Sequence, residues 1–360
     1  MMKVMSRFQK YSFIGLLTTL VVALGACKKW LPEDLDYISP KAGFVQVLFN
    51  PTLGRTTVYS RVFNTDNSTT PLTFKIVNVR LRGTGEPTHD FEKTVPVWVW
   101  TRSYTGDEKS VAEIDAKRKL ENHQVFEIRE KSGDFILWNA ADSTMLRQLP
   151  DPGYLFDVVV SNSGGTNTYK DLTLTPQWGI PYSPDDDVNP LTGKPMEEKI
   201  KGSSDTTKTQ LKYIHPVVFN MLGDSTELPI KSDSVRVMFR KTGDGSSLTF
   251  KFLNKDSLLM NPANFNRTGP LDSLLHGFNV KATSTYIRYD VAYPIPVVNY
   301  PTRWTTGDGR QTKVEFAFDR KGFGGSIQRG YLDFSFAIYQ KGDWEVIFFF
   351  ASDTPRFRDE

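Results

Sequence analysis

The chain has 360 residues, a length that favours two domains. Hydrophobic residues make up 39% of it and aromatic residues 13%, which is enough for a buried core and excludes disorder throughout. The formal charge is only +3 and no clustered basic surface is indicated, so nucleic acid is not expected as a partner.

The first 26 residues have the pattern of a secretory signal peptide. Lys3, Arg7 and Lys10 form a basic stretch, and residues 11–26 are apolar and end in small side chains. This apolar run is too short for a comfortable membrane-spanning helix. We expect residues 1–26 to be removed. Losing these three of the 44 basic residues leaves 41, which balances the 41 acidic residues.

The sequence Leu24-Gly25-Ala26-Cys27 resembles the lipobox of bacterial lipoproteins. The resemblance implies cleavage before Cys27, lipidation of its thiol and anchoring in a lipid bilayer. The alternative is an ordinary cleaved signal followed by a chance cysteine. Cys27 is the only cysteine, however, and an exported chain with one thiol would otherwise carry an unexplained free cysteine.

Residues 27–42 read as a tether behind the lipidated cysteine. Position 28 is Lys, whereas an Asp at this position would resemble an inner-membrane retention signal. Lys28 and Lys29, with Glu33, Asp34 and Asp36, loosely resemble the surface-export signals of Bacteroidota lipoproteins. We therefore expect the protein on the bacterial outer membrane, facing outward.

Alternation of apolar and polar residues with period two dominates the rest of the chain and predicts strands. It is clearest at residues 235–240, 287–291 and 314–319. Further strands are predicted at residues 43–49, 56–63, 72–82, 94–100, 134–138, 154–161, 168–175, 248–253, 278–293, 331–340 and 344–350. The apolar phase slips between Ile76 and Val77, which predicts a bulge.

One helix is predicted, at residues 107–122. Glu113 and Lys117, and likewise Asp115 and Lys119, are spaced four apart and could pair on one face.

Two β-hairpins are predicted, each late in its half of the chain. The first covers residues 152–175, and its start, Pro152-Gly153-Tyr154, is typical of the tyrosine corner of immunoglobulin-like sandwiches. The second covers residues 330–350, with a turn at Gly342-Asp343. Its last strand is apolar on both faces near its end, which predicts an interior strand. We therefore predict an all-β fold with two β-sandwich domains, immunoglobulin-like or jelly-roll-like, at residues 43–176 and 211–355. The Pro-rich residues 177–210 are interpreted as a linker or long loop.

Motifs for catalysis are not evident. The four histidines do not stand at metal-ligand spacing, and no nucleophile elbow or phosphate loop occurs. We expect no enzyme, no metal and no cofactor, although two carboxylates suffice for a glycosidase and cannot be paired from sequence. Residues 185–189 carry side-chain oxygens at alternate positions, as calcium-binding loops do. Pro190 and Met196 stand where such a loop would need Gly and Glu. A solvated acidic segment is therefore favoured.

Aromatic residues supply the candidate ligand site. Tyr300 and Trp304 lie in a Pro-interrupted loop with Arg303 and Asp308, and exposed rings beside polar groups suit sugars. The alternative is that these rings cap the end of the sandwich. Trp98 and Trp100 share one strand face and form a second candidate platform. Trp138 and Trp344 are expected in the core.

In overall plan the chain resembles a Bacteroidota lipoprotein family and is similar to the accessory surface glycan-binding lipoproteins of starch-utilisation-type loci. The lipobox at residues 24–27 is the specific motif for this resemblance. It implies a non-catalytic surface lipoprotein that binds a polysaccharide or oligosaccharide for uptake, beside an outer-membrane transporter complex.

Two alternatives remain open. One is a structural pilin-type or adhesin-type subunit, processed near Arg55 or Arg61 and assembled by strand exchange at a sheet edge. The second alternative is a glycoside hydrolase.

Overall fold

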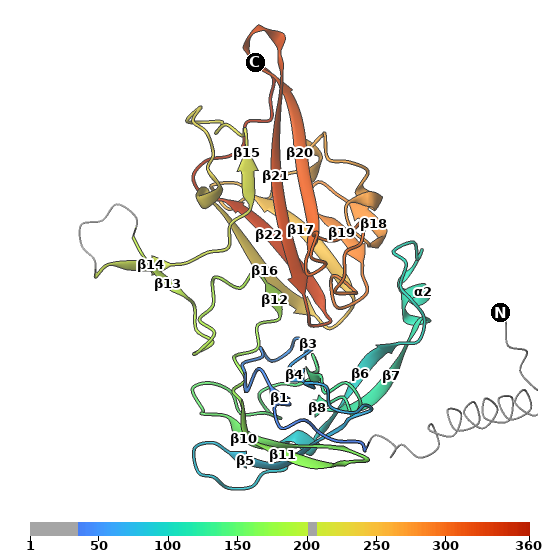
Figure 1. Cartoon of the computed structure of the whole chain (residues 1–360). Coiled ribbons are helices and arrows are strands. Elements are labelled where there is room, and N and C mark those ends of the chain that lie inside the picture. The colour runs from blue at the N-terminus through green and yellow to red at the C-terminus, as the bar shows by residue number, and fades with distance from the viewer. Residues whose placement is uncertain (1–34, 201–206) are drawn as a thin grey trace, which may run out of the picture.

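The computed structural model describes residues 35–200 and 207–360. The expected signal peptide at residues 1–26, the expected lipidation site Cys27 and the first part of the tether lie outside the described residues. Within the described parts nearly every regular element is a β-strand, so the all-β prediction is confirmed. None of the described helices has the length and apolar character needed to cross a membrane. Figure 1 shows two β-rich lobes joined end to end.

The first domain comprises the strands up to β11 and has its own hydrophobic core. One sheet has four strands in the order β2 (Leu48–Phe49), β11 (Gly165–Leu174), β10 (Tyr154–Asn162) and β5 (Thr73–Leu81). The remaining strands form smaller ladders: β3 (Thr57–Tyr59), β9 (Phe135–Leu137) and β8 (Phe126–Ile128); β1 (Gly43–Phe44) and β4 (Phe63–Asn64); and β6 (Thr94–Trp100) and β7 (Arg118–Gln124). Phe156 of β10 packs against Phe126 and Phe135 across the core, which makes the domain a sandwich.

The predicted first hairpin and its tyrosine corner are present. Strands β10 and β11 pair antiparallel, and the Tyr154 hydroxyl accepts a hydrogen bond from the backbone N–H of Arg147 at 2.7 Å. The same hydroxyl donates to the Asp90 carboxylate at 2.8 Å. Gly153 has a φ of +80°, and a Cβ there would lie 2.3 Å from the Leu174 carbonyl oxygen, so only glycine fits. The order β11-β10-β5 matches the G-F-C order of immunoglobulin-like sandwiches.

The bulge predicted in the strand at residues 72–82 is also present, slightly later than expected. The register of β5 against β10 shifts between Val77 and Arg80. Asn78 takes a φ of +53° there, and its side chain donates to the Asp157 carboxylate at 3.0 Å.

The helix predicted at residues 107–122 is wrong over most of its length. Only α2 (Val111–Asp115) is helical, and the chain then enters β7, which pairs with β6 along its whole length. The expected pairs do not form, because Lys117 contacts Glu108 and Lys119 contacts Glu121. Charge pairs four apart stabilise a helix by only about 0.2–0.5 kcal/mol each. From residue 117 onward the segment also lacks an apolar stripe, so pairing with β6 prevails.

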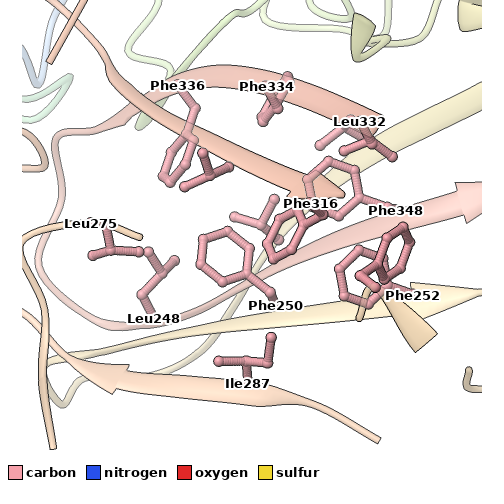
Figure 2. Close-up of a cluster of buried hydrophobic side chains, with 14 of the residues drawn as sticks. Leu248, Phe250, Phe252, Leu275, Ile287, Phe316, Leu332, Phe334, Phe336 and Phe348 are labelled. Carbon is pink, nitrogen blue, oxygen red and sulfur yellow. The ribbon is translucent and has the colours of Figure 1, made fainter. Parts of the chain in front are cut away.

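The second domain comprises two facing sheets around a separate core. One sheet has five strands in the order β16 (Val235–Gly243), β22 (Asp343–Phe350), β17 (Ser247–Leu253), β19 (Ile287–Asp290) and β18 (Phe278–Ala282). In the other, β21 (Ile327–Ile338) pairs with β20 (Thr312–Lys321), β15 (Val217–Phe219) and β12 (Tyr182–Ser183). Figure 2 shows Phe250, Phe252 and Phe348 from the first sheet meeting Phe316 and Phe336 from the second.

The hairpin predicted at residues 330–350 is wrong, although both of its strands exist. Strands β21 and β22 do not pair with each other, and they lie in opposite sheets of the sandwich. Strand β22 lies between β16 and β17, antiparallel to one and parallel to the other. Its near-continuous apolar sequence correctly indicated an interior strand, and burial on a central position outweighs the turn signal at Gly342-Asp343.

The segment at residues 177–210, expected to be a linker or loop, carries regular structure. Strand β12 adds to the second domain's sheet, and β13 (Glu197–Lys199) pairs with β14 (Thr209–Leu211). Short 3₁₀ turns complete the described structure: η2 (Asp90–Glu92), η3 (Ser232–Ser234), η4 (Pro262–Asn264), η5 (Leu271–Ser273) and η6 (Phe323–Gly325).

Candidate functional site

A cleft of about 560 Å³ lies between the two domains and is lined by both. Its aromatic lining residues are Trp98, Trp100, Trp138, Tyr293, Tyr300 and Tyr339. Uncharged polar side chains at Thr56, Asn139, Ser246 and Asn299 also line it. Cavities of about 300–1,000 Å³ with apolar walls and a few polar groups are typical of small-molecule sites.

Strand β6 presents two of these rings because of its alternation. Val95 and Val97 point into the first domain's core and are almost fully buried. Trp98 and Trp100 therefore share the opposite face, as predicted, and this face looks into the cleft. Trp98 is 49% exposed, so a large apolar ring faces solvent there.

Arg118 holds the two indoles in place and was not predicted as a site residue. Its guanidinium carbon lies 4.9 Å from the Trp98 ring centroid and 5.9 Å from that of Trp100. The guanidinium also donates to the Tyr293 carbonyl oxygen at 2.7 Å and pairs with the Asp115 carboxylate. With only 6% of its side chain exposed, Arg118 links the platform on β6 to the second domain.

Trp138 and Tyr339 are further cleft residues that sequence reasoning missed. Trp138 was expected in the core, but it lines the cleft while its Nε1 donates to Glu127 at 3.1 Å. Tyr339 follows β21, and the Arg55 guanidinium lies 4.6 Å from its ring centroid. Trp344, also expected in the core, is buried there.

The loop residues predicted to contact a ligand lie in different parts of the structure. Tyr300 lines the cleft, and its hydroxyl donates to the Tyr104 carbonyl oxygen at 3.0 Å. Trp304 Nε1 and the Arg303 guanidinium both donate to the Gly106 carbonyl oxygen, at 3.0 and 2.9 Å. Asp308 is solvent-exposed and accepts from Thr306 and the backbone of Arg310. The structure thus brings Tyr300 to Trp98 and Trp100, whereas Arg303, Trp304 and Asp308 do not line the cleft.

The domains are held together beside the cleft by polar contacts from Arg55. Its guanidinium donates to the Ile180 and Tyr182 carbonyl oxygens and to the Asp185 carboxylate, the last at 2.7 Å. This side chain therefore ties the first domain to β12 and the residues on either side of it.

An apolar cluster forms a second junction between the domains. Tyr104 and Ile114 of the first domain pack with Ala292 and Val298 of the second. His276 adds two hydrogen bonds, because its Nε2 donates to the Glu108 carbonyl oxygen at 3.0 Å and its Nδ1 contacts the Tyr104 hydroxyl. Burial lowers the pKa of His276, which keeps the imidazole neutral at this junction.

Acidic groups are scarce in the cleft. Asp115 is the one carboxylate among the described lining residues, and Arg118 already pairs with it. Four cationic side chains line the same cleft: Arg118, Arg129, Arg310 and Lys341. The cleft is therefore electropositive, with aromatic walls.

The acidic segment at residues 185–189 does not converge on a point. Asp185 pairs with Arg55, Asp186 with Lys212, and Asp187 accepts from the Tyr182 hydroxyl at 3.1 Å. Across residues 35–200 and 207–360, no three His, Cys, Asp or Glu side chains are arranged to hold a metal ion.

Comparison with known proteins identifies the family. Residues 63–359 match the sequence model described as Domain of unknown function (DUF5007), and the chain belongs to that family. No significant match is found among curated proteins or among solved structures. The matched region contains every residue that lines the cleft except Thr56 and Val58.

Proposed function

We propose that this DUF5007 protein is a membrane-anchored surface lipoprotein that binds a glycan in the cleft between its domains, without catalysis, for uptake. The convergence of Trp98, Trp100 and Tyr300 on one cleft carries this proposal. Tyr300 lies about two hundred positions from the two tryptophans in the chain, and the fold brings all three to a single cleft.

The chemistry of the cleft suits a sugar. Aromatic faces pack against the apolar C–H faces of pyranose rings, while amides and hydroxyls bond the sugar hydroxyls. Asn139 and Asn299 supply amides, one from each domain. Because Arg118 holds the indoles of Trp98 and Trp100, little side-chain entropy is lost when a ligand stacks on them.

The anchoring part of the proposal rests on the sequence. The lipobox at residues 24–27 supports lipidation of Cys27, and the resemblance to accessory glycan-binding lipoproteins supports an outer-membrane site beside a transporter complex. A lipid-anchored binding protein of this kind would raise the local concentration of an oligosaccharide near its transporter.

The alternatives are less well supported. A pilin-type subunit processed near Arg55 would need that residue accessible, yet its guanidinium is engaged at the domain junction. Arg61, the other expected position, is exposed. A glycoside hydrolase needs two carboxylates beside the scissile bond, and the described lining of the cleft offers only Asp115.

Native affinity gels test the proposal. Residues 28–360, which include all that the structure describes, would be run through gels containing different polysaccharides, alongside Trp98→Ala. We expect one glycan to retard the protein and the variant to bind it about tenfold more weakly, equivalent to ~1.4 kcal/mol. Phe323→Ala is the control, because Phe323 is a fully solvated ring outside the cleft. Retardation by no glycan, or equal retardation of Trp98→Ala, would overturn the proposal.

A further inference from the structure

We propose that the ligand of this cleft is an anionic glycan, a sugar chain that carries carboxylate or sulfate groups. The inference rests on the proposed function and names the chemical class of its ligand. It follows from the charges that line the cleft and from the way each is engaged.

One of the four cations is already neutralised. Arg118 is buried under the indoles and pairs with Asp115, the single carboxylate of the described lining. This pair leaves the charge of Arg129, Arg310 and Lys341 uncompensated within the cleft.

These three cations are free to meet a ligand. Arg129 contacts Asp134 at 3.7 Å and Arg310 contacts Asp308 at 3.9 Å, and both guanidinium groups are mostly exposed. Such surface pairs contribute about 0–1 kcal/mol and are readily exchanged for a better partner. Lys341 is exposed, and among the described residues no carboxylate lies within 4.0 Å of its ammonium group.

The positive charge is local to the cleft. After loss of residues 1–26 the basic and acidic residues of the chain balance, so a generally basic surface does not explain it. A hollow with low-dielectric aromatic walls concentrates the field of its charges, which favours an anion inside it. The three cations come from both domains, with Arg129 on one wall and Arg310 and Lys341 on the other.

The combination of groups matches an acidic sugar better than a neutral one. An arginine fork binds a carboxylate or a sulfate through two parallel hydrogen bonds, and a lysine adds a point charge. The indoles of Trp98 and Trp100 would take the ring face, which leaves an exocyclic acid group to reach the cations. A neutral glycan could accept hydrogen bonds from these three cations, but it would gain no charge–charge attraction.

Pairs of polysaccharides that differ only in charge test the inference. Residues 28–360 would be titrated calorimetrically with polygalacturonate and its methyl-esterified form, with dextran sulfate and dextran, and with alginate. We expect at least one acidic polymer to bind at least tenfold more tightly than its neutral counterpart, with affinity falling as salt rises. The carboxylated and sulfated arms show which acid group is recognised.

Matched variants separate cleft binding from general charge attraction. The double variant Arg310→Gln/Lys341→Gln should bind the acidic polymer at least tenfold more weakly. The control Arg267→Gln/Lys321→Gln removes one arginine and one lysine that do not line the cleft. Lys321 and Lys341 lie at opposite ends of β21, because one precedes this strand and the other follows it. All four side chains are exposed, so both double variants should fold.

The outcomes are distinguishable. Loss of acidic-polymer binding in the cleft variant and in Trp98→Ala, but not in the control, supports the inference. Equal loss in both double variants shows unspecific charge attraction and overturns it. Binding of a neutral glycan that depends on Trp98 but not on Arg310 and Lys341 overturns the inference and leaves the proposed function standing. No binding of any polymer overturns both.

Discussion

The imidazole of His276 and the indole of Trp304 are stacked, with ring centroids 5.2 Å apart and an interplanar angle of 1°. Both rings belong to the second domain, and both donate to backbone carbonyl oxygens of one loop in the first: Trp304 to Gly106 and His276 to Glu108. The stacked pair and this loop form a clasp between the domains. A tryptophan that the sequence marked as a ligand contact therefore serves, in this structure, to hold the cleft's two walls together.

Acidification should weaken this clasp. Burial favours the neutral ring, in which Nε2 of His276 donates to the Glu108 carbonyl oxygen and Nδ1 accepts from the Tyr104 hydroxyl. Burial lowers the pKa of His276 below its usual value of about 6.5. The unfolded chain then binds more protons below that pH, so the free energy of unfolding should fall as pH drops from 7.5 to 5.5.

Urea unfolding of the wild type and of His276→Phe at those two pH values measures the effect. Phenylalanine keeps the stacking on Trp304 but does not titrate, so the variant should be less stable at pH 7.5 and should lose less on acidification. An equal pH dependence in both proteins would show that another group is responsible.

The free energy of unfolding should show a second pH dependence, at lower pH, that comes from Glu108. Burial alone would raise the pKa of this carboxyl, but hydrogen bonds from Lys117 and from Thr105 outweigh it and lower the pKa to about 2. The stabilisation is therefore present above the unfolded pKa of about 4.3 and is lost as pH falls through about 2.

Glu108→Gln should remove this dependence. At pH 7 the variant should lose about 2–3 kcal/mol of unfolding free energy, since the Lys117 ammonium is left without its partner in a half-buried place. Between pH 4.5 and 2 its stability should change less steeply than that of the wild type, measured by denaturant unfolding. If the unfolding free energies of the two proteins fell in parallel with pH, Glu108 would not be the titrating group.

The tyrosine corner should contribute measurably to the first domain. Tyr154→Phe retains the buried ring but leaves the Arg147 N–H and the Asp90 carboxylate without their shared partner. We expect a loss of about 1–2 kcal/mol in the free energy of unfolding. Tyr331→Phe is a suitable control, because its half-exposed ring stacks on Phe219 and should cost less than about 0.5 kcal/mol. Similar losses in the two variants would argue against the corner.

Arg118 should act on binding through the rings it holds. Arg118→Lys keeps one positive charge but lacks the planar fork that spans the Asp115 carboxylate and the Tyr293 carbonyl oxygen. We expect about tenfold weaker glycan binding and greater quenching of tryptophan fluorescence by acrylamide. Unchanged affinity together with unchanged quenching would show that the indoles need no such support.

Strand identities could be predicted where burial alternates along the chain. Strands β16 and β20 follow the period-two pattern at residues 235–240 and 314–319, and Pro152-Gly153-Tyr154 correctly indicated the corner. Pairing partners could not be predicted in the same way. The order β16-β22-β17 depends on contacts between strands about a hundred residues apart, and a local turn signal at Gly342 carries no information about them.

The candidate site shows the same division. The shared face of Trp98 and Trp100 is a local property of one strand and was predicted from alternation. Arg118, Trp138 and Tyr339 were missed because the cleft forms only when two domains meet. Arg118 lies directly opposite Trp100 in the ladder between β6 and β7. Interpreting residues 107–122 as a helix hid this cross-strand pairing.

The central place of β22 also sets an order of assembly. The strands of the first domain are complete by Leu174, so its sheets need no strand from the rest of the chain. In the second, β16 and β17 have no common neighbour until residues 343–350 emerge, close to the end of the chain. The second domain can close only when residues 343–350 are in place, and until then the edges of β16 and β17 that pair with β22 are unpaired. A truncation just before Asp343 would therefore remove the middle of a sheet rather than its edge.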